Sequence, residues 1–114
     1  MKRILVVEDD RARCLELANM LMEFGFEVAV ADTSAGALDT LVDADPLPDL
    51  LLVDITMPDG DGLRLVEIVR KHRLFCKMKM VKMAGDRAFT SDPKSFCEIE
   101  KPMPEFVQEF VSCH

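Results

Sequence analysis

Residues 50–62 read LLLVDITMPDGDG, a hydrophobic run that ends in an acidic loop rich in Pro and Gly. The four apolar residues 50–53 are typical of a strand that is covered on both faces of a parallel sheet. The Pro and Gly residues that follow exclude regular structure in the loop. Asp54 is therefore expected at the carboxyl end of a buried strand, which is where ligands bind in open α/β sheets.

Four more short apolar runs predict strands, and amphipathic segments between them predict helices. The additional strands are expected at residues 4–7, 28–31, 78–83 and 97–100. Asp10 is a plausible cap for the first helix, and Pro104 suits the first position of the last one. Residues 84–95 are poorly patterned, so the fourth helix is expected to be shortened or missing. The alternation predicts an α/β fold, a flavodoxin-like (βα)5 doubly wound around a five-stranded parallel sheet.

The amino-acid composition excludes several kinds of protein. The 114 residues are 49% hydrophobic and 31% charged, which suits one packed domain over residues 1–114. The net charge of −7 argues against nucleic acid as a direct partner. The longest apolar runs fall far short of the roughly 20 residues that a membrane helix needs. Four scattered Cys residues without a paired spacing favour reduced thiols, so a cytoplasmic protein that does not enter a membrane is expected.

Acidic side chains follow two strands that neighbour one another in a flavodoxin-like sheet. Glu8 and Asp9 end the first strand, and Asp54 ends the third. Three carboxylates so close together are unfavourable unless they share a proton or bind a divalent cation, and Mg²⁺ prefers such oxygen ligands. Lys101, after the fifth strand, could reach the same crevice from the other side. A cation opposite a carboxylate cluster suits a phosphoryl group.

Three motifs together resemble the receiver domain of bacterial two-component response regulators. They are VVEDD at residues 6–10, LVDITMP at residues 52–58 followed by Asp61-Gly62, and Lys101-Pro102. The resemblance covers essentially the whole chain, in the right order and at nearly the usual spacings. It implies a sheet of strand order 2-1-3-4-5. It also implies a regulatory protein and not an enzyme in the usual sense, with only self-phosphorylation and self-dephosphorylation.

The same resemblance implies a role for each site residue. Asp54 would be the phosphoacceptor, taking a phosphoryl group from a sensor histidine kinase or a phosphotransfer protein. Asp9, Asp54 and the backbone carbonyl of Thr56 would bind Mg²⁺, and Glu8 would act through water. Lys101 would contact the phosphoryl oxygens. A downstream protein target or a fused output domain would read the signal, and the domain itself would be a monomer or a weak dimer.

The chain departs from the family pattern where the signal is normally read. The Ser or Thr that usually ends the fourth strand is replaced by Met83, and a thioether cannot donate a hydrogen bond. The usual aromatic residue before the Lys-Pro pair is replaced by Glu98, with Phe96 as an off-register substitute. The segment between Met83 and Lys101 is also short. Atypical coupling of phosphorylation to output is therefore expected.

Two other functions are consistent with these residues. One is a pseudo-receiver, a protein-binding module that keeps the fold and acts without phosphorylation, which the missing switch residues favour. The other is a magnesium-dependent phosphatase of the haloacid-dehalogenase type, which also uses an Asp after a strand. Such phosphatases need a second Asp two residues further on, where this chain has Thr56.

Overall fold

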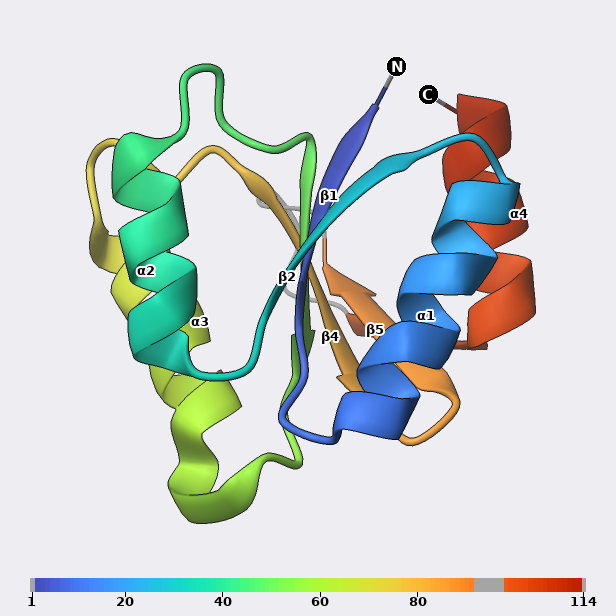
Figure 1. Ribbon diagram of the computed structural model, residues 1–114, viewed down its shortest axis with the longest axis horizontal. Helices are drawn as coiled ribbons and strands as arrows, with labels where there is room; N and C mark the ends of the chain where they lie inside the picture. Colours follow the sequence, from blue (N-terminus) through green and yellow to red (C-terminus); the bar gives the residue numbers. More distant parts are fainter. Residues whose placement is uncertain (1, 92–97, 114) are drawn as a thin grey trace.

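The computed structural model describes residues 2–91 and 98–113, and Figure 1 shows its helices and strands along the chain. Strands and helices alternate up to β4, as predicted. The strands are β1 (Arg3–Val7), β2 (Glu27–Ala31), β3 (Leu50–Asp54), β4 (Lys79–Ala84), β5 (Arg87–Ser91) and β6 (Glu98–Pro102). The helices are α1 (Arg11–Glu23), α2 (Ser34–Asp43), the short 3-10 helix η1 (Pro58–Gly60), α3 (Asp61–Lys71) and α4 (Met103–Cys113).

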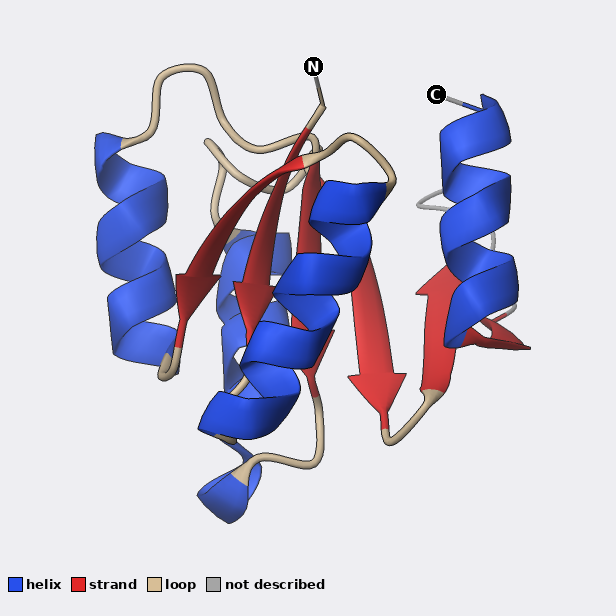
Figure 2. Ribbon diagram, turned by 45° about the vertical axis from the view of Figure 1, so that its right-hand side comes forward, coloured by secondary structure: helices blue, strands red, loops and turns tan. Residues whose placement is uncertain are grey.

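Six strands form one sheet in the order β2-β1-β3-β4-β5-β6. β1 pairs in parallel with β2 and with β3, and β3 pairs in parallel with β4. Figure 2 shows these four strands running in one direction and β5 running against them. The carboxyl ends of β1 and β3 therefore lie side by side, and this is the position of the predicted site.

Helices cover both faces of the sheet, and each face has its own core. In Figure 1, α2 and α3 lie on one side of the sheet, and α1 and α4 lie on the other. Alternate residues of β3 divide between the two cores: Leu50 and Leu52 face α1 and α4, whereas Leu51 and Val53 face α2 and α3. All four side chains are buried. Because strand side chains alternate, residues 50–53 leave no polar position on either face, which confirms the sandwiched strand predicted from them.

The far edge of the sheet differs from the predicted order. The segment expected to hold the fourth helix instead forms β5, which pairs antiparallel with β4 and then with β6. No helix occurs between β4 and β6 in the part of this segment that the structure describes. The predicted fifth strand thus becomes the sixth, and the sheet is neither five-stranded nor wholly parallel. The flavodoxin-like α/β class is confirmed despite this change.

Local signals explain most helix boundaries. Asp10 caps α1, as predicted, by accepting a hydrogen bond from the backbone N–H of Arg13 at 3.1 Å. The loop after Asp54 is less irregular than predicted, since it contains η1 and leads directly into α3 at Asp61. Pro104 is the second residue of α4. Within residues 2–91 and 98–113, no helix is both long enough and apolar enough to cross a membrane.

Candidate functional site

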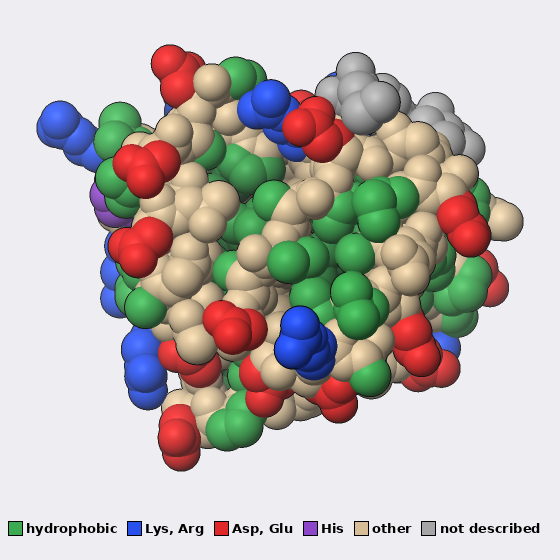
Figure 3. Space-filling model, in the orientation of Figure 1, with side chains coloured by type: hydrophobic (Ala, Val, Ile, Leu, Met, Phe, Trp, Pro, Cys, Tyr) green, Lys and Arg blue, Asp and Glu red, His purple; other side chains and the backbone are tan. Residues whose placement is uncertain are grey.

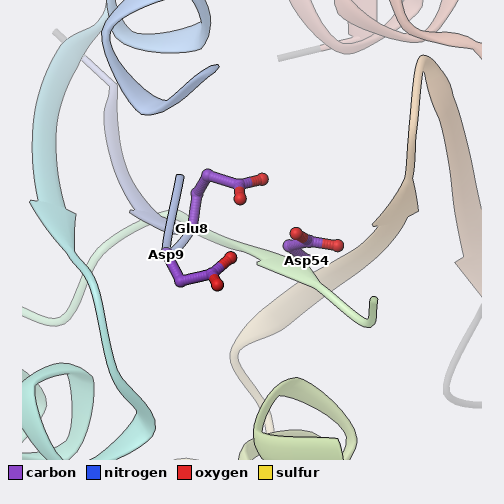
Figure 4. A group of neighbouring side chains, drawn as sticks. All are labelled: Glu8, Asp9 and Asp54. Atoms are coloured by element: carbon purple, nitrogen blue, oxygen red, sulfur yellow. The ribbon is translucent and has the colours of Figure 1, made fainter. Parts of the chain in front are cut away.

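Three carboxylates converge where β1 and β3 end. Glu8 and Asp9 follow β1, and Asp54 is the last residue of β3; Figure 4 shows the three side chains gathered in one region. One carboxylate oxygen from each lies within 4.8 Å of the others. Glu8 and Asp54 are buried and Asp9 is exposed, so the group opens to solvent on one side. The structure thus brings these three predicted residues together. Figure 3 shows further acidic side chains along the lower part of the molecule, the end at which β1 and β3 finish.

Asp54 is held in place by its own loop. The backbone N–H and the hydroxyl of Thr56 both donate to Oδ1 of Asp54, at 2.8 and 2.6 Å. Thr56 therefore holds Oδ1 of Asp54 in place and makes neither of these two hydrogen bonds to Oδ2. Gly62 is also required here, because a Cβ at this position would lie 1.9 Å from the carbonyl oxygen of Asp54. The Asp61-Gly62 pair is visible in the sequence, but this close approach depends on how α3 packs against β3.

Glu8 is a carboxylate with little contact to water. Its side chain is 1% exposed, and Oε1 accepts a hydrogen bond from the backbone N–H of Asp10 at 3.1 Å. Oε2 is buried without a hydrogen-bond partner. Burial raises the pKa of Glu8 to about 7; the Asp10 N–H opposes this rise, and the nearby carboxylates Asp54 and Asp9 add to it. A nearby cation would therefore stabilise the charged form of Glu8.

A positive charge that the sequence pattern did not predict lies beside Glu8. Nε of Arg13, in the first turn of α1, is 3.2 Å from Oε2 of Glu8. The two atoms are within ion-pair distance, yet neither makes a hydrogen bond, because the contact lacks hydrogen-bond geometry. The Arg13 side chain is 33% exposed, so most of it is packed at the site. The spacing from Glu8 could have indicated this contact, since residues early in α1 lie above the end of β1.

The residues present fit a magnesium ion. Mg²⁺ prefers hard oxygen ligands at 2.0–2.1 Å, so two ligands on opposite sides of the ion lie about 4 Å apart. The separation of at most 4.8 Å between the three carboxylate oxygens is close to this value. Oε2 of Glu8 is also buried without a hydrogen-bond donor, and a bound cation would compensate its charge.

The structure does not bring Lys101 to this cluster. In register, Asp54 pairs with Met83, Met83 with Ala88, and Ala88 with Lys101, so three strand spacings of about 4.8 Å each separate Asp54 from Lys101. The Lys101 ammonium pairs with Glu109 of α4 instead. The insertion of β5 is the physical reason, because it moves the Lys-Pro strand one position further from β3 than the predicted order would place it.

The two altered switch positions lie in different surroundings. Met83 is fully buried in the core beneath α1 and α4, opposite Asp54 in the neighbouring strand. Glu98 is exposed on the edge strand β6 and pairs with Lys82. Burial lowers the pKa of Lys82, and the positive charge of Arg70 adds to this. Phe96, the possible aromatic substitute, lies outside the described residues.

Comparison with known proteins agrees with this geometry. The family model "Response regulator receiver domain" matches residues 4–93. The chemotaxis protein CheY of Bacillus subtilis is 30% identical over 90 residues, covering 79% of this chain and 74% of CheY. The transcriptional regulatory protein CpxR of Escherichia coli is 39% identical over 71 residues, covering 62% of this chain and 29% of CpxR. The match thus spans about three tenths of that longer relative.

Solved structures show the same architecture. Response regulator TrrA of Thermotoga maritima, in complex with Mg²⁺-BeF, has a TM-score of 0.66 and 32% identity over 74% of this chain and 70% of its own. A complex of histidine kinase ThkA with TrrA contains a chain with a TM-score of 0.66 and 30% identity, covering 83% of this chain and 75% of that one. The acidic cluster and the family match agree, and the chain belongs to the response regulator receiver domain family.

Proposed function

We propose that residues 1–114 act as one phosphoacceptor receiver domain in which Asp54 takes a phosphoryl group from a histidine kinase. The observation that supports this most directly is the convergence of Glu8, Asp9 and Asp54 at the ends of β1 and β3. A second support is the complex in which the similar protein TrrA is bound to histidine kinase ThkA. The proposed setting is the cytoplasm, where response regulators generally act.

The chemistry requires little covalent work from the protein. An Asp54 carboxylate oxygen forms a bond to phosphorus as the phosphorus–nitrogen bond of the donor's phosphohistidine breaks. The electron pair of that bond leaves with the imidazole, which takes up a proton. Thr56 holds Oδ1 through two hydrogen bonds, so Oδ2 is oriented to attack. Later attack of water on phosphorus returns the carboxylate and inorganic phosphate, which makes the modification transient.

Glu8, Asp9, Asp54 and the Thr56 carbonyl are the proposed magnesium ligands, with Glu8 acting through water. When bound, Mg²⁺ would neutralise charge that develops on the phosphoryl oxygens. Because Asp9 faces solvent, a phosphodonor can approach on that side. The proposal assigns no phosphoryl contact to Lys101, since its ammonium pairs with Glu109.

A second candidate is the pseudo-receiver, which binds a partner through its fold without phosphorylation. The placement of Met83 and Lys101 favours it. The usual hydroxyl position is filled by a fully buried thioether, and the usual lysine is engaged on α4. Both features remove contacts through which a phosphoryl group would alter β4 and the strands beyond it. The geometry of the acidic cluster favours the first candidate.

Phosphorylation of the whole chain by acetyl phosphate distinguishes the two candidates. The protein is incubated with acetyl phosphate and Mg²⁺ and then weighed intact by mass spectrometry. We expect one labile phosphate that requires Mg²⁺ and that is absent from Asp54→Asn. Asp59→Asn is the matched control, because Asp59 lies in the same loop but outside the carboxylate cluster. An unmodified wild-type mass under these conditions would support the pseudo-receiver.

A further inference from the structure

A phosphoryl group on Asp54 needs a positive charge close to it, and Lys101, the residue expected to supply that charge, lies elsewhere. Phosphorylation of Asp54 would replace its single negative charge with up to two on the phosphoryl oxygens, beside the carboxylates of Glu8 and Asp9. Lys101 pairs with Glu109, and Lys82 pairs with Glu98 across the sheet. Lys101 lies beyond β5, and Lys82, although it lies opposite Val53 on β4, has its ammonium engaged by Glu98 of β6.

The guanidinium of Arg13 lies beside the acidic cluster, where a positive charge is needed. Its Nε lies 3.2 Å from Oε2 of Glu8, and an oxygen of Glu8 lies within 4.8 Å of an oxygen of Asp54. A phosphoryl group on Asp54 would extend into the region that the two carboxylates share. The guanidinium is anchored from α1, whose first turn is fixed by the Asp10 cap.

The unused hydrogen-bonding capacity of Arg13 points to an additional ligand. Nε is buried and makes no hydrogen bond, although it lies in ion-pair range of Glu8. Buried donors of this kind are rarely left without a partner unless a ligand satisfies them. A guanidinium presents several donors in a rigid fork that matches the oxygens of a phosphoryl group. Neither Oε2 of Glu8 nor Nε of Arg13 is satisfied by the other alone.

We propose that Arg13 is the phosphoryl-contacting residue of this receiver and takes the place that the family pattern gives to Lys101. Its guanidinium donates hydrogen bonds to the oxygens of the phosphoryl group on Asp54. Glu8 orients the guanidinium through their ion pair. This inference rests on the proposed role of Asp54 as phosphoacceptor. It concerns how the negative charge is neutralised and does not alter the residue that is modified.

Beryllofluoride, a stable analogue of a phosphoryl group, tests the proposal directly. Its binding to the whole chain is measured by ¹⁹F NMR at saturating Mg²⁺, and binding of Mg²⁺ alone is measured by calorimetry. Arg13→Met is expected to weaken beryllofluoride binding roughly tenfold or more, since charge-assisted contacts to the analogue are lost. It is expected to bind Mg²⁺ at least as tightly as wild type, because a positive charge beside Glu8 has been removed.

Opposite changes in the two affinities separate this role from a merely structural one. If Arg13→Met failed to fold, its affinities for beryllofluoride and for Mg²⁺ would both fall. Arg13→Gln, which keeps hydrogen-bond donors without the charge, must then bind beryllofluoride more weakly and Mg²⁺ at least as tightly as wild type. Arg13→Lys should recover part of the beryllofluoride affinity. Arg11→Met is the matched control, because Arg11 is exposed on the same turn of α1. That control should match wild type in both measurements.

Three results would overturn the inference. Equal beryllofluoride affinity in wild type and Arg13→Met would show that the guanidinium makes no such contact, while leaving Asp54 as acceptor intact. A larger loss in Lys101→Met than in Arg13→Met would return the role to Lys101. If wild type bound no beryllofluoride and accepted no phosphate from acetyl phosphate, the proposed function would fail together with this inference.

Discussion

Glu8 is the residue on which the electrostatics of the site depend most. It is almost fully buried beside Asp54 and Asp9, and burial is the largest cause of its raised pKa of about 7. A charged carboxylate in such surroundings lowers the stability of the fold unless a cation is near. Arg13 supplies part of that compensation, and a divalent ion would supply the remainder.

Glu8→Gln should therefore stabilise the protein and weaken its metal site. We expect a gain of about 1–2 kcal/mol in the free energy of unfolding without Mg²⁺, since the cost of burying a charged carboxylate and its repulsion by Asp54 are removed while Oε1 still accepts from Asp10. Mg²⁺ affinity should fall at least tenfold. Urea denaturation and calorimetry measure the two quantities. A variant that is less stable than wild type and binds Mg²⁺ unchanged would contradict this account.

Met83 shows that the usual switch hydroxyl cannot simply be restored. The side chain is fully buried among apolar residues of β3, β4 and α4. Met83→Thr would leave a smaller side chain with a hydroxyl among apolar neighbours, and we expect a loss of about 2–3 kcal/mol of unfolding free energy. Met22→Thr on the exposed face of α1, where Met22 is 50% exposed, should change it by less than about 1 kcal/mol. Equal losses in the two variants, measured by urea denaturation, would disprove the explanation.

At the scale of elements, the start of α3 links the site to α2. Asp61 accepts hydrogen bonds from the backbone N–H and the hydroxyl of Ser34, at 2.8 and 2.6 Å. Ser34 begins α2, so one carboxylate ties the first turns of two helices together. The hydrogen bonds from the Ser34 hydroxyl and backbone lower the pKa of Asp61 below its usual 3.8.

Asp61→Asn should reduce stability in a manner that depends on pH. A carboxylate with a lowered pKa in the folded state stabilises the fold fully above its unfolded pKa and loses that contribution as pH falls through the folded value. We therefore expect a deficit of about 1–2 kcal/mol at pH 7, which shrinks below about pH 4. Urea denaturation at several pH values measures it. A deficit that stays constant down to pH 3 would show that the charge of Asp61 is not involved.

Gly62 determines how closely α3 approaches β3. A methyl group at this position would overlap the backbone of Asp54, which cannot move without shifting the strand end. Gly62→Ala should therefore cost several kcal/mol of stability and displace Asp54, with lower Mg²⁺ affinity as the second effect. Gly36→Ala in α2 is the control, since its nearest contact would be a Thr33 side chain at 3.2 Å and its backbone can remain helical. Thermal denaturation and calorimetry compare the two variants, and equal behaviour would contradict the argument.

At the scale of the whole molecule, negative charge is in excess and concentrates partly at one end of the sheet. The chain has 21 acidic and 14 basic side chains, and three acidic groups share the site. A ligand that binds only the folded state stabilises it, by about 2.7 kcal/mol when present at 100 times its dissociation constant. Mg²⁺ should therefore stabilise the complete fold and not only the loops around Asp54.

The measurement is the unfolding free energy in urea with and without MgCl₂, against NaCl at equal ionic strength. We expect stabilisation to rise with Mg²⁺ concentration in wild type and to be largely absent in Asp54→Asn. Equal stabilisation by NaCl would mean that general screening of the net charge, and not a specific site, is responsible.

Most elements of this fold could be predicted because their signals are local. A continuous apolar run such as residues 50–53 and a cap such as Asp10 each indicate structure within a few residues. The strand β5 was not predicted, although Gly85-Asp86 between two strands is a known hairpin signal and Gly85 has a φ of 62°. Its weak alternation of apolar and polar residues concealed it, and pairing with β4 and β6 supplies the hydrogen bonds that stabilise it.

The sequence alone determined the α/β class and the meeting of Glu8, Asp9 and Asp54, because strand ends are local features and parallel neighbours place them at one edge. The position of Lys101 beyond β5 and the contact between Arg13 and Glu8 became apparent from the folded chain. Strand insertion and helix packing depend on contacts between segments far apart in the chain, and no pattern within one segment encodes them. Arg13 is only five residues from Glu8, but the contact between their side chains depends on how α1 packs against the sheet.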